Sequence, residues 1–346
     1  MNLIVVGTNH KFSPIELRER LVFPKKRLKN ALFLLKEWQI FKGAVILSTC
    51  NRMEIYASTE NLESARGQII NFLSRYHEIE TKNFLPYLYT YEAKEALRHL
   101  FAVTCGLDSL ILGETQISGQ VKQAYLEARE IGFADEFLRK TFIQALSFAK
   151  MIHKETKISE GKISVGSLAL DFIKGRLGNL SSKNILIIGV GKVSELVLQY
   201  LKKERPNVIF VSNRTFEKAK ALASEINGAA VRFDRLRESL KKVDVVITAT
   251  ASPHFIIKKE TLEGLINHGL LIVDLALPRN VEPLVKDIMG VELFCLEDLG
   301  TVIKKNFEKK KEEAKKIEEV IKIKAERLWQ KLTVLEPEPA FLRLSR

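Results

Sequence analysis

A cysteine and an arginine lie two residues apart in a short polar stretch, Ser48-Thr49-Cys50-Asn51-Arg52. A thiol held beside a cation loses its proton more readily, and the thiolate is the nucleophilic form of cysteine. The pair therefore indicates covalent catalysis by Cys50. The alternative is that Cys50 is a small buried residue without reactivity, as most structural cysteines are.

The segments on either side of this stretch have the composition of β-strands. Residues 44–47 and 53–56 are short, apolar and rich in β-branched and aromatic side chains. They place Cys50 at a tight connection between two strands. Helices are predicted around this pair over residues 14–20, 24–38 and 61–76. Strands and helices that alternate over so short a span predict a small α+β sandwich.

A second polar cluster lies in the helical region that follows. Residues 106–120 have an apolar background punctuated by glycines and interrupted by polar side chains, namely Ser109, Glu114, Gln116 and Gln120. Such polar groups need partners, so the block predicts either a pocket for a small polar ligand or ordinary loop and helix-cap contacts. His99 precedes the block on a helix with an apolar stripe. It is a candidate for proton transfer or a structural histidine.

A nucleotide-binding motif stands in the middle of the chain. The apolar strand 184–188 runs into Gly189-Val190-Gly191-Lys192-Val193-Ser194, and a helix over 195–203 follows. In the order strand, G-x-G, helix, the glycines allow close approach of a pyrophosphate, which the helix N-terminus receives. Ser194 replaces the third glycine of the usual pattern.

The next strand, 208–211, indicates which dinucleotide is bound. It ends in Ser212-Asn213-Arg214-Thr215, where an NAD site would have an acidic residue for the ribose hydroxyls. A serine and an arginine suit the 2′-phosphate of NADP instead. Strands over 243–250 and 270–274 follow, and the loops after them, 251–254 and 277–279, should face the cofactor.

Composition limits the class of protein. The chain has 346 residues, 46% of them hydrophobic and 28% charged, which is ordinary for a globular protein of two or three domains. No apolar run is long enough to cross a bilayer, and the N-terminus runs directly into a strand without a presequence. Three scattered cysteines predict neither a disulfide framework nor a metal cluster. We therefore expect a cytoplasmic protein.

The net charge of +13 favours a polyanionic partner such as a nucleic acid. Much of the excess lies in lysines from 304 onward, and a lysine-rich helix face is commonly just solvated. The same region predicts one long amphipathic helix, whose stripe would need the body of the protein or a second copy as its partner. Its apolar positions are Ile303, Phe307, Ala314, Ile317, Ile321, Ala325, Leu328, Leu332 and Leu335.

Taken together, these motifs resemble the glutamyl-tRNA reductase family. The resemblance keeps the family's order and extends to about residue 335. The matching segments are 7–11 with Arg18-Glu19, 48–56, 106–120, the Gly189 loop, 212–215, 251–254 and 274–279. Departures are Met53, Thr115 and Cys105, where Thr, Pro and a small residue are expected; none touches the expected chemistry.

The resemblance implies an activity. Cys50 would attack the ester that joins glutamate to the tRNA(Glu) 3′ end, giving a thioester and releasing the tRNA. NADPH would then reduce the thioester to glutamate-1-semialdehyde, the first step of C5-pathway tetrapyrrole (porphyrin, haem) biosynthesis. By this resemblance the catalytic residues are Cys50 and His99, and Arg52 would pair with the substrate carboxylate. The glutamate pocket would be lined by Thr49, Asn51, Arg52, Ser109, Glu114, Thr115, Gln116 and Gln120. NADPH would be held by Gly189, Val190, Gly191, Lys192, Val193, Ser194, Asn213 and Arg214.

The expected architecture is an α/β multidomain protein. Residues 1–156 would form an α+β catalytic domain that binds glutamyl-tRNA, and 157–298 a Rossmann-like NADP-binding domain. Residues 299–346 would be a long linking helix and a truncated dimerisation region, because family members continue into a helical dimerisation domain. The resemblance also implies a homodimer and a glutamate-1-semialdehyde aminomutase that receives the labile product.

Two other interpretations remain open at this point. The middle region, with Asn213-Arg214-Thr215 and Ser252-Pro253, also resembles shikimate and quinate dehydrogenases, which use no cysteine nucleophile. The other is a regulatory homologue that binds tRNA and senses NADP without catalysis. An intact Cys50 speaks against it.

Overall fold

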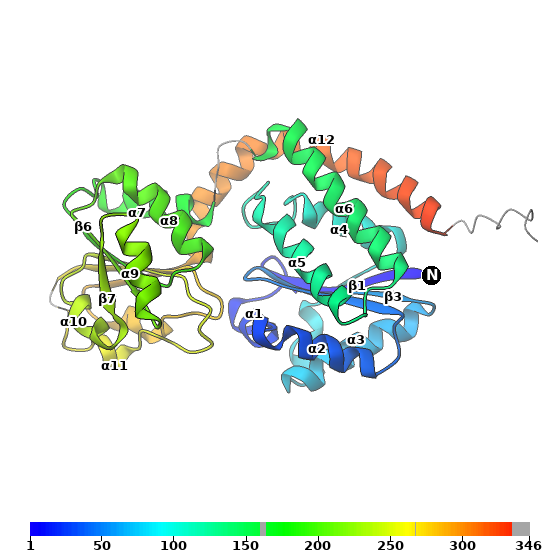
Figure 1. The fold of residues 1–346 in the computed structure, drawn as a ribbon, viewed down its shortest axis with the longest axis horizontal. Coiled ribbons are helices and arrows are strands. Elements are labelled where there is room, and N and C mark those ends of the chain that lie inside the picture. Colours follow the sequence, from blue (N-terminus) through cyan, green and yellow to red (C-terminus); the bar gives the residue numbers. More distant parts are fainter. Residues whose placement is uncertain (160–163, 267, 334–346) are drawn as a thin grey trace, which may run out of the picture. The chain divides into compact units, whose positions relative to one another are not determined.

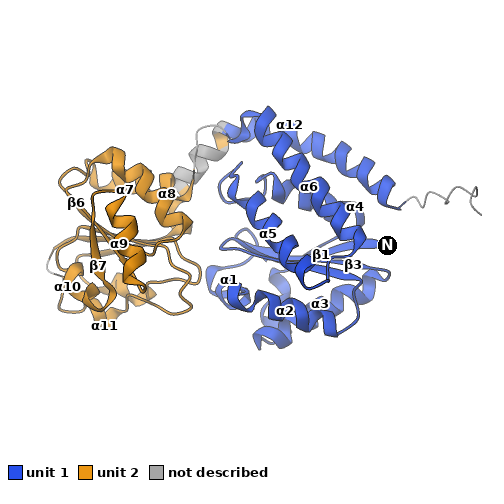
Figure 2. Cartoon of the chain, viewed as in Figure 1, with its two compact units in different colours: residues 1–159, 310–346 blue, residues 160–309 orange. Residues whose placement is uncertain are grey.

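The computed structural model describes residues 1–159, 164–266 and 268–333. The chain divides into two compact units (Figure 2). Unit 1 comprises residues 1–159 with 310–346, and unit 2 comprises residues 160–309. The sequence predicts boundaries at 156/157 and 298/299. The structure differs at the second, since residues from 310 onward group with unit 1 rather than forming a separate region.

Unit 1 is built around an antiparallel sheet with the order β2-β3-β1-β4. Its strands are β1 (Asn2–Asn9), β2 (Gly43–Ser48), β3 (Arg52–Thr59) and β4 (Tyr89–Glu92). The whole of β3 is buried, because it lies between two neighbours in the sheet and between two layers of helices. The predicted strands on both sides of Cys50 are therefore confirmed, and only residues 49–51 connect them.

Helices cover both faces of this sheet (Figure 1). One layer contains α1 (Ile15–Leu21), α2 (Lys25–Glu37) and α3 (Leu62–His77), and the other contains α4 (Ala93–Thr104), α5 (Gln116–Glu130) and α6 (Glu136–Glu155). The apolar stripe predicted on the helix that carries His99 is fully buried at Leu97, Leu100 and Phe101. Two helix layers around one sheet give the α+β sandwich expected from the sequence.

The long C-terminal helix, α12 (Gly300–Thr333), uses its stripe within the same chain. Its buried positions, Ala314, Ile317, Ile321, Ala325 and Leu328, belong to the unit 1 core. The ring of Trp329 also contacts that of Phe137 on α6 at 6.3 Å. The sequence allowed two partners for the stripe, the body of the protein or a second copy. This part of the helix packs against the body of the protein. The predicted stripe positions Ile303, Phe307 and Leu335 lie outside the described side chains.

Unit 2 has a six-stranded parallel sheet with the order β10-β9-β8-β5-β6-β7. Numbered within the domain, this is the order 3-2-1-4-5-6 of the dinucleotide-binding Rossmann fold, read from the other edge. Its strands are β5 (Asn184–Ile188), β6 (Val208–Asn213), β7 (Ala229–Arg232), β8 (Val245–Thr248), β9 (Leu270–Asp274) and β10 (Val291–Cys295). The fold expected from the glycine motif is confirmed.

In unit 2, one helix precedes the first strand of this sheet and the others each follow a strand. They are α7 (Val165–Leu177), α8 (Lys192–Glu204), α9 (Phe216–Ser224), α10 (Leu236–Leu240) and α11 (Lys259–Leu262). The strand order reverses between β5 and β8, and in folds of this kind the ligand crevice lies outside the carboxyl ends of the strands at that point. Over the residues described, no helix combines the length and apolarity needed to span a membrane.

Candidate active site

The turn that carries Cys50 is held by its neighbours. The Thr49 hydroxyl accepts hydrogen bonds from the backbone N–H groups of Asn51 and Arg52, at 3.1 and 3.2 Å. From outside the turn, Nη1 of Arg18 donates to the Cys50 carbonyl oxygen at 3.1 Å. Cys50 itself is half-buried. The thiol therefore sits on a short, well-anchored connection at the end of the sheet.

Arg52 is the first residue of β3, and its guanidinium already forms hydrogen bonds to other residues of unit 1. Nη1 lies 2.6 Å from the Glu54 carboxylate, and Nη2 donates to both the carbonyl oxygen and the carboxylate of Asp108. Its side chain is 1% exposed. The predicted pairing of Arg52 with a substrate carboxylate therefore requires that carboxylate to replace one of these acceptors.

Glu54 is the centre of the buried network that this pair begins. Its carboxylate accepts hydrogen bonds from the hydroxyls of Tyr56 and Tyr89 and lies 2.7 Å from Nε2 of His99. Burial alone would raise the pKa of Glu54, but the Arg52 charge and His99 hold it well below its usual value. His99 thus belongs to the same network as the Cys50 turn, through Glu54 and Arg52.

Asp108 links the network to the loop before α5. Besides Arg52, it accepts hydrogen bonds from the side chains of Asn9 at 3.0 Å and Lys11 at 2.6 Å. The positive charge of Arg52 and then that of Lys11 lower the pKa of Asp108 despite its burial. Asp108 is 19% exposed, so it is the solvent-accessible end of the Arg52 pair.

Three buried polar atoms near the turn have no hydrogen-bond partner within the described residues. They are Thr8 Oγ1, His10 Nδ1 and Asn51 Oδ1. Strand pairing sets Thr8 opposite Met53, and the His10 N–H donates to the Asn51 carbonyl oxygen at 3.0 Å, so all three lie at one end of the sheet. Burial, followed by the Arg52 charge, lowers the pKa of His10 to about 4, which keeps the ring neutral at pH 7. Unsatisfied buried groups beside a candidate nucleophile are suited to binding a polar ligand.

The block from 106 to 120 forms a closed loop and then enters α5. Gly106 and Gly113 both have positive φ, and the Gly113 N–H donates to the Gly106 carbonyl oxygen at 2.9 Å. Ser109 is buried, and burial raises the pKa of Glu114. Of the other predicted pocket residues, Thr115 and Gln120 are exposed and Gln116 is half-buried. Their contact with a substrate stays a prediction.

In unit 2, the glycine motif lies in the loop between β5 and α8, called the cradle below. Gly189 has φ +113, and a Cβ there would lie 2.5 Å from the Ala249 carbonyl oxygen, so the loops after β5 and β8 approach as only glycine permits. A Cβ on Gly191 would meet nothing within 4 Å, which leaves open space in front of the N-terminus of α8. This arrangement fits a dinucleotide pyrophosphate.

Polar groups surround this cradle. Ser194 and Ser212 are fully buried, and their hydroxyls have no hydrogen-bond partner within the described part of the chain. Asn213 ends β6, and Arg214 follows it as an exposed side chain. Both lie at the carboxyl end of β6, where the sequence predicts a site for a 2′-phosphate.

Asp274 organises the neighbouring loop, after β9. Its buried carboxylate accepts hydrogen bonds from the Thr248 hydroxyl at 2.6 Å and from the backbone of Ala276, Asn280 and Val281. The Asn280 side chain in turn accepts from the Thr250 N–H at 3.0 Å. One aspartate therefore ties together the loops after β8 and β9, which border the predicted cofactor site.

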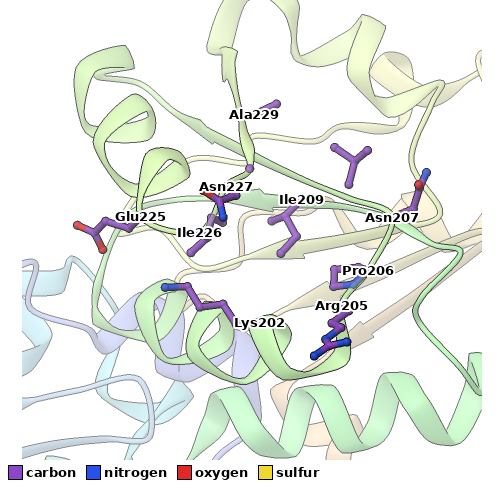
Figure 3. A pocket seen from close by; sticks show the side chains of 11 residues that line it. Lys202, Arg205, Pro206, Asn207, Ile209, Glu225, Ile226, Asn227 and Ala229 are labelled. Atoms are coloured by element: carbon purple, nitrogen blue, oxygen red, sulfur yellow. The ribbon is translucent and has the colours of Figure 1, made fainter.

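A separate hollow of about 540 Å³ lies at the opposite end of the strands of the same sheet, near the start of β6 (Figure 3). It opens between the end of α8, the start of β6 and the turn before β7, and Lys202, Arg205, Asn207 and Asn227 are among its lining residues. Because β5 and β6 are parallel, the start of β6 lies at the opposite end of the sheet from the Gly189 loop, which follows the end of β5. The hollow is thus not the predicted dinucleotide site.

Several residues of the turn's surroundings and of the buried network were not identified as site residues from the sequence, namely Thr8, Asn9, His10, Arg18, Glu54, Tyr89 and Asp108. One signal was available, because Arg52, Glu54 and Tyr56 alternate along β3 and so share one face of a fully buried strand. Polar side chains in that pattern require buried partners. The partners themselves come from distant parts of the chain.

Comparison with known proteins covers both units. A family model described as glutamyl-tRNA(Glu) reductase, N-terminal domain, matches residues 6–156. A second, described as shikimate / quinate 5-dehydrogenase, matches residues 171–302. The resemblance to the latter family is therefore limited to the dinucleotide-binding region.

Relatives match over most of the chain. The glutamyl-tRNA reductase of Pelotomaculum thermopropionicum is 40% identical over 325 residues, which cover 93% of this chain and 73% of that protein. That of Thermodesulfovibrio yellowstonii is 38% identical over 355 residues, with 99% and 83% covered. Among solved structures, the glutamyl-tRNA reductase of Methanopyrus kandleri is 32% identical with a TM-score of 0.52, and 95% of this chain and 81% of that chain are covered.

Proposed function

This chain belongs to the glutamyl-tRNA reductase family, and from that premise we propose that it reduces the glutamyl group of glutamyl-tRNA(Glu) to glutamate-1-semialdehyde with NADPH. The reaction would be the first step of tetrapyrrole synthesis. The observation that carries the proposal is the anchored Cys50 turn, which is bordered by unsatisfied buried polar atoms and backed by the network of Arg52 and Glu54.

Cys50 performs the covalent step. Its thiolate attacks the carbonyl carbon of the ester; the carbon–oxygen bond to the terminal ribose breaks, and the ribose oxygen leaves with a proton as the tRNA departs. A thioester on Cys50 remains. Thiolate is a good leaving group, so reduction of the thioester carbonyl releases the aldehyde and regenerates Cys50.

The glutamyl group would be bound by the polar side chains around the turn. Arg52 would receive the substrate carboxylate in a bidentate pairing, with that carboxylate replacing Asp108, the more exposed of its two acidic partners. His99 would handle protons, and the Glu54 carboxylate, 2.7 Å from its Nε2, would orient the ring. Thr49, Asn51, Ser109, Glu114, Thr115, Gln116 and Gln120 complete the proposed pocket.

The cofactor would be held by unit 2. When bound, NADPH supplies the hydride for the thioester. Residues 189–194 would take the pyrophosphate through backbone N–H groups, while Asn213 and Arg214 would take the 2′-phosphate. The open space at Gly191 and the exposed Arg214 support this assignment. We further propose a cytoplasmic homodimer that passes the labile aldehyde to an aminomutase.

The test is incubation with radiolabelled glutamyl-tRNA and NADPH, followed by detection of the semialdehyde. Without NADPH, we expect the label on Cys50 and slow release of free glutamate, because water can take the thioester. Cys50→Ser should abolish both labelling and reduction while tRNA binding persists. Retained turnover in that variant would overturn the role of Cys50, and a wild type that neither forms the adduct nor makes aldehyde would overturn the function.

A further inference from the structure

Positive charge is concentrated at the end of α1 and the start of α2. Residues 20–27, called the basic segment below, contain four cations and no acidic residue. All four are exposed: Arg20, Lys25, Lys26 and Arg27. Such a cluster attracts anions more strongly than the scattered charges of an ordinary surface.

The basic segment is held against the Cys50 turn. Leu21 and Phe23 are buried in the unit 1 core, so the backbone between the cations is anchored. The Phe23 N–H donates to the Ser48 hydroxyl at 2.9 Å, and Ser48 is the last residue before the turn. From the other side, Arg18 donates to the Cys50 carbonyl oxygen. The backbone of the basic segment is therefore fixed beside the turn that carries the nucleophile.

Within the described residues, none of these four cations forms an ion pair with a carboxylate, whereas several other exposed cations of unit 1 do. The paired ones include Lys29 with Glu130, Lys42 with Glu60, Lys94 with Glu326, Arg98 with Glu95 and Arg139 with Glu136. The first turn of α2 also lacks an acidic residue, although cations at a helix N-terminus are unfavourable. This arrangement favours an anionic partner from outside the chain.

We propose that the basic segment binds the phosphate backbone of the tRNA next to its 3′ end. This inference rests on the proposed function, because the ester that Cys50 attacks is at that end. The 3′ end of a tRNA is single-stranded, and cations beside a single strand bind its phosphates without reading its sequence. The role of the segment is to hold the terminal nucleotides while the ester reaches the turn.

The test compares a charge-removing variant with two matched variants. Lys25→Gln/Lys26→Gln/Arg27→Gln should raise the Kd for uncharged tRNA about tenfold or more at low salt. It should also reduce the slope of log K against log salt by about 2, since each phosphate contact to a single strand contributes about 0.7. The charge-retaining variant Lys25→Arg/Lys26→Arg/Arg27→Lys should bind as the wild type does.

The control removes the same charge elsewhere on unit 1, in Lys42→Gln/Lys140→Gln/Lys316→Gln. These side chains are 61%, 56% and 77% exposed, and each lies beside a carboxylate partner. We expect its Kd to stay within about twofold of the wild type, because paired cations release few counterions. An equal loss in test and control variants would show that only net charge matters and would overturn the inference, as would an unchanged Kd and slope in the test variant. Thermal unfolding of each variant checks that the fold is intact.

Labelling of Cys50 separates this inference from the proposed function. If the wild type forms the glutamyl adduct and the test variant binds tRNA normally, the basic segment is not the tRNA contact and the function stands. If the wild type forms no adduct, the function fails independently of the binding data.

Discussion

The guanidinium of Arg52 lies 2.6 Å from the carboxylate of Glu54, and the two side chains are 1% and 0% exposed. Both residues are on β3, on the face that also carries Tyr56. Through Glu54 the pair reaches His99 on α4 and Tyr89 on β4. The residue two positions after the candidate nucleophile thus joins the Cys50 turn to the interior of unit 1.

Glu54→Gln should destabilise unit 1. Removing one partner of a buried ion pair costs about 3–5 kcal/mol, because the other charge is left uncompensated. Asp108 still faces Arg52, so we expect the lower end of that range. Urea unfolding followed by tryptophan fluorescence measures it, since both tryptophans, Trp38 and Trp329, are in unit 1.

The control for this substitution is Glu95→Gln, which removes an exposed pair with Arg98. Its free energy of unfolding should change by less than about 1 kcal/mol. A loss below about 1 kcal/mol in Glu54→Gln itself would mean that the buried network is not a source of stability.

His77 should make unit 1 less stable in mild acid. Its ring packs between Phe23 and Tyr76, at centroid distances of 4.6 and 4.9 Å, and burial lowers its pKa to about 4. The unfolded chain has the usual pKa near 6.5, so between pH 6.5 and 4 it binds more protons than the folded one. The free energy of unfolding therefore falls as pH falls through that window.

The measurement is the difference in unfolding free energy between pH 7 and pH 5, by the same fluorescence method. In His77→Leu this difference should shrink by roughly 1–2 kcal/mol, since the titrating group is gone. His254→Leu, at an exposed position in unit 2, should leave it unchanged. An equal pH dependence in His77→Leu and the wild type would contradict the assigned cause.

The sequence predicted what depends on neighbours in the chain. The strand and glycines around Gly189 lie within a few residues of one another, so the Rossmann unit could be read directly. The network around Glu54 could not, because its bonds join residues 45, 56 and 99 positions apart. Periodicity likewise revealed the stripe of α12, but not that the core of unit 1 covers part of it. The periodicity of apolar residues shows which face of a helix or strand is buried. It does not show which part of the protein covers that face.

Gly113→Ala should disrupt the loop that carries Ser109 and Glu114. Gly113 has φ +77, and a Cβ there would lie 2.2 Å from the Ile158 carbonyl oxygen, so the backbone must move. We expect a loss of about 2 kcal/mol or more in unfolding free energy, from strain and overlap together.

Gly119→Ala is the matched control, since its Cβ would meet nothing within 4 Å. Because Gly119 is inside α5, that change should stabilise by about 0.5–1 kcal/mol. Equal effects at both positions would argue against the steric explanation.

Arg214→Ala should weaken the binding of NADPH much more than that of NADH. If Arg214 binds the 2′-phosphate, the variant loses a charge-assisted contact of about 1.5–3 kcal/mol, which raises the Kd for NADPH about tenfold to a hundredfold. NADH lacks that phosphate, so its Kd should change by less than about threefold. Fluorescence titration of both cofactors measures the two constants.

Arg205→Asn is the control. Arg205 is an exposed arginine near the opposite end of the strands of the same sheet, and asparagine tolerates its positive φ. It should leave both constants unchanged. Equal weakening of NADPH and NADH by Arg214→Ala would refute the assignment of the phosphate site, since only a group on the 2′-phosphate distinguishes the two.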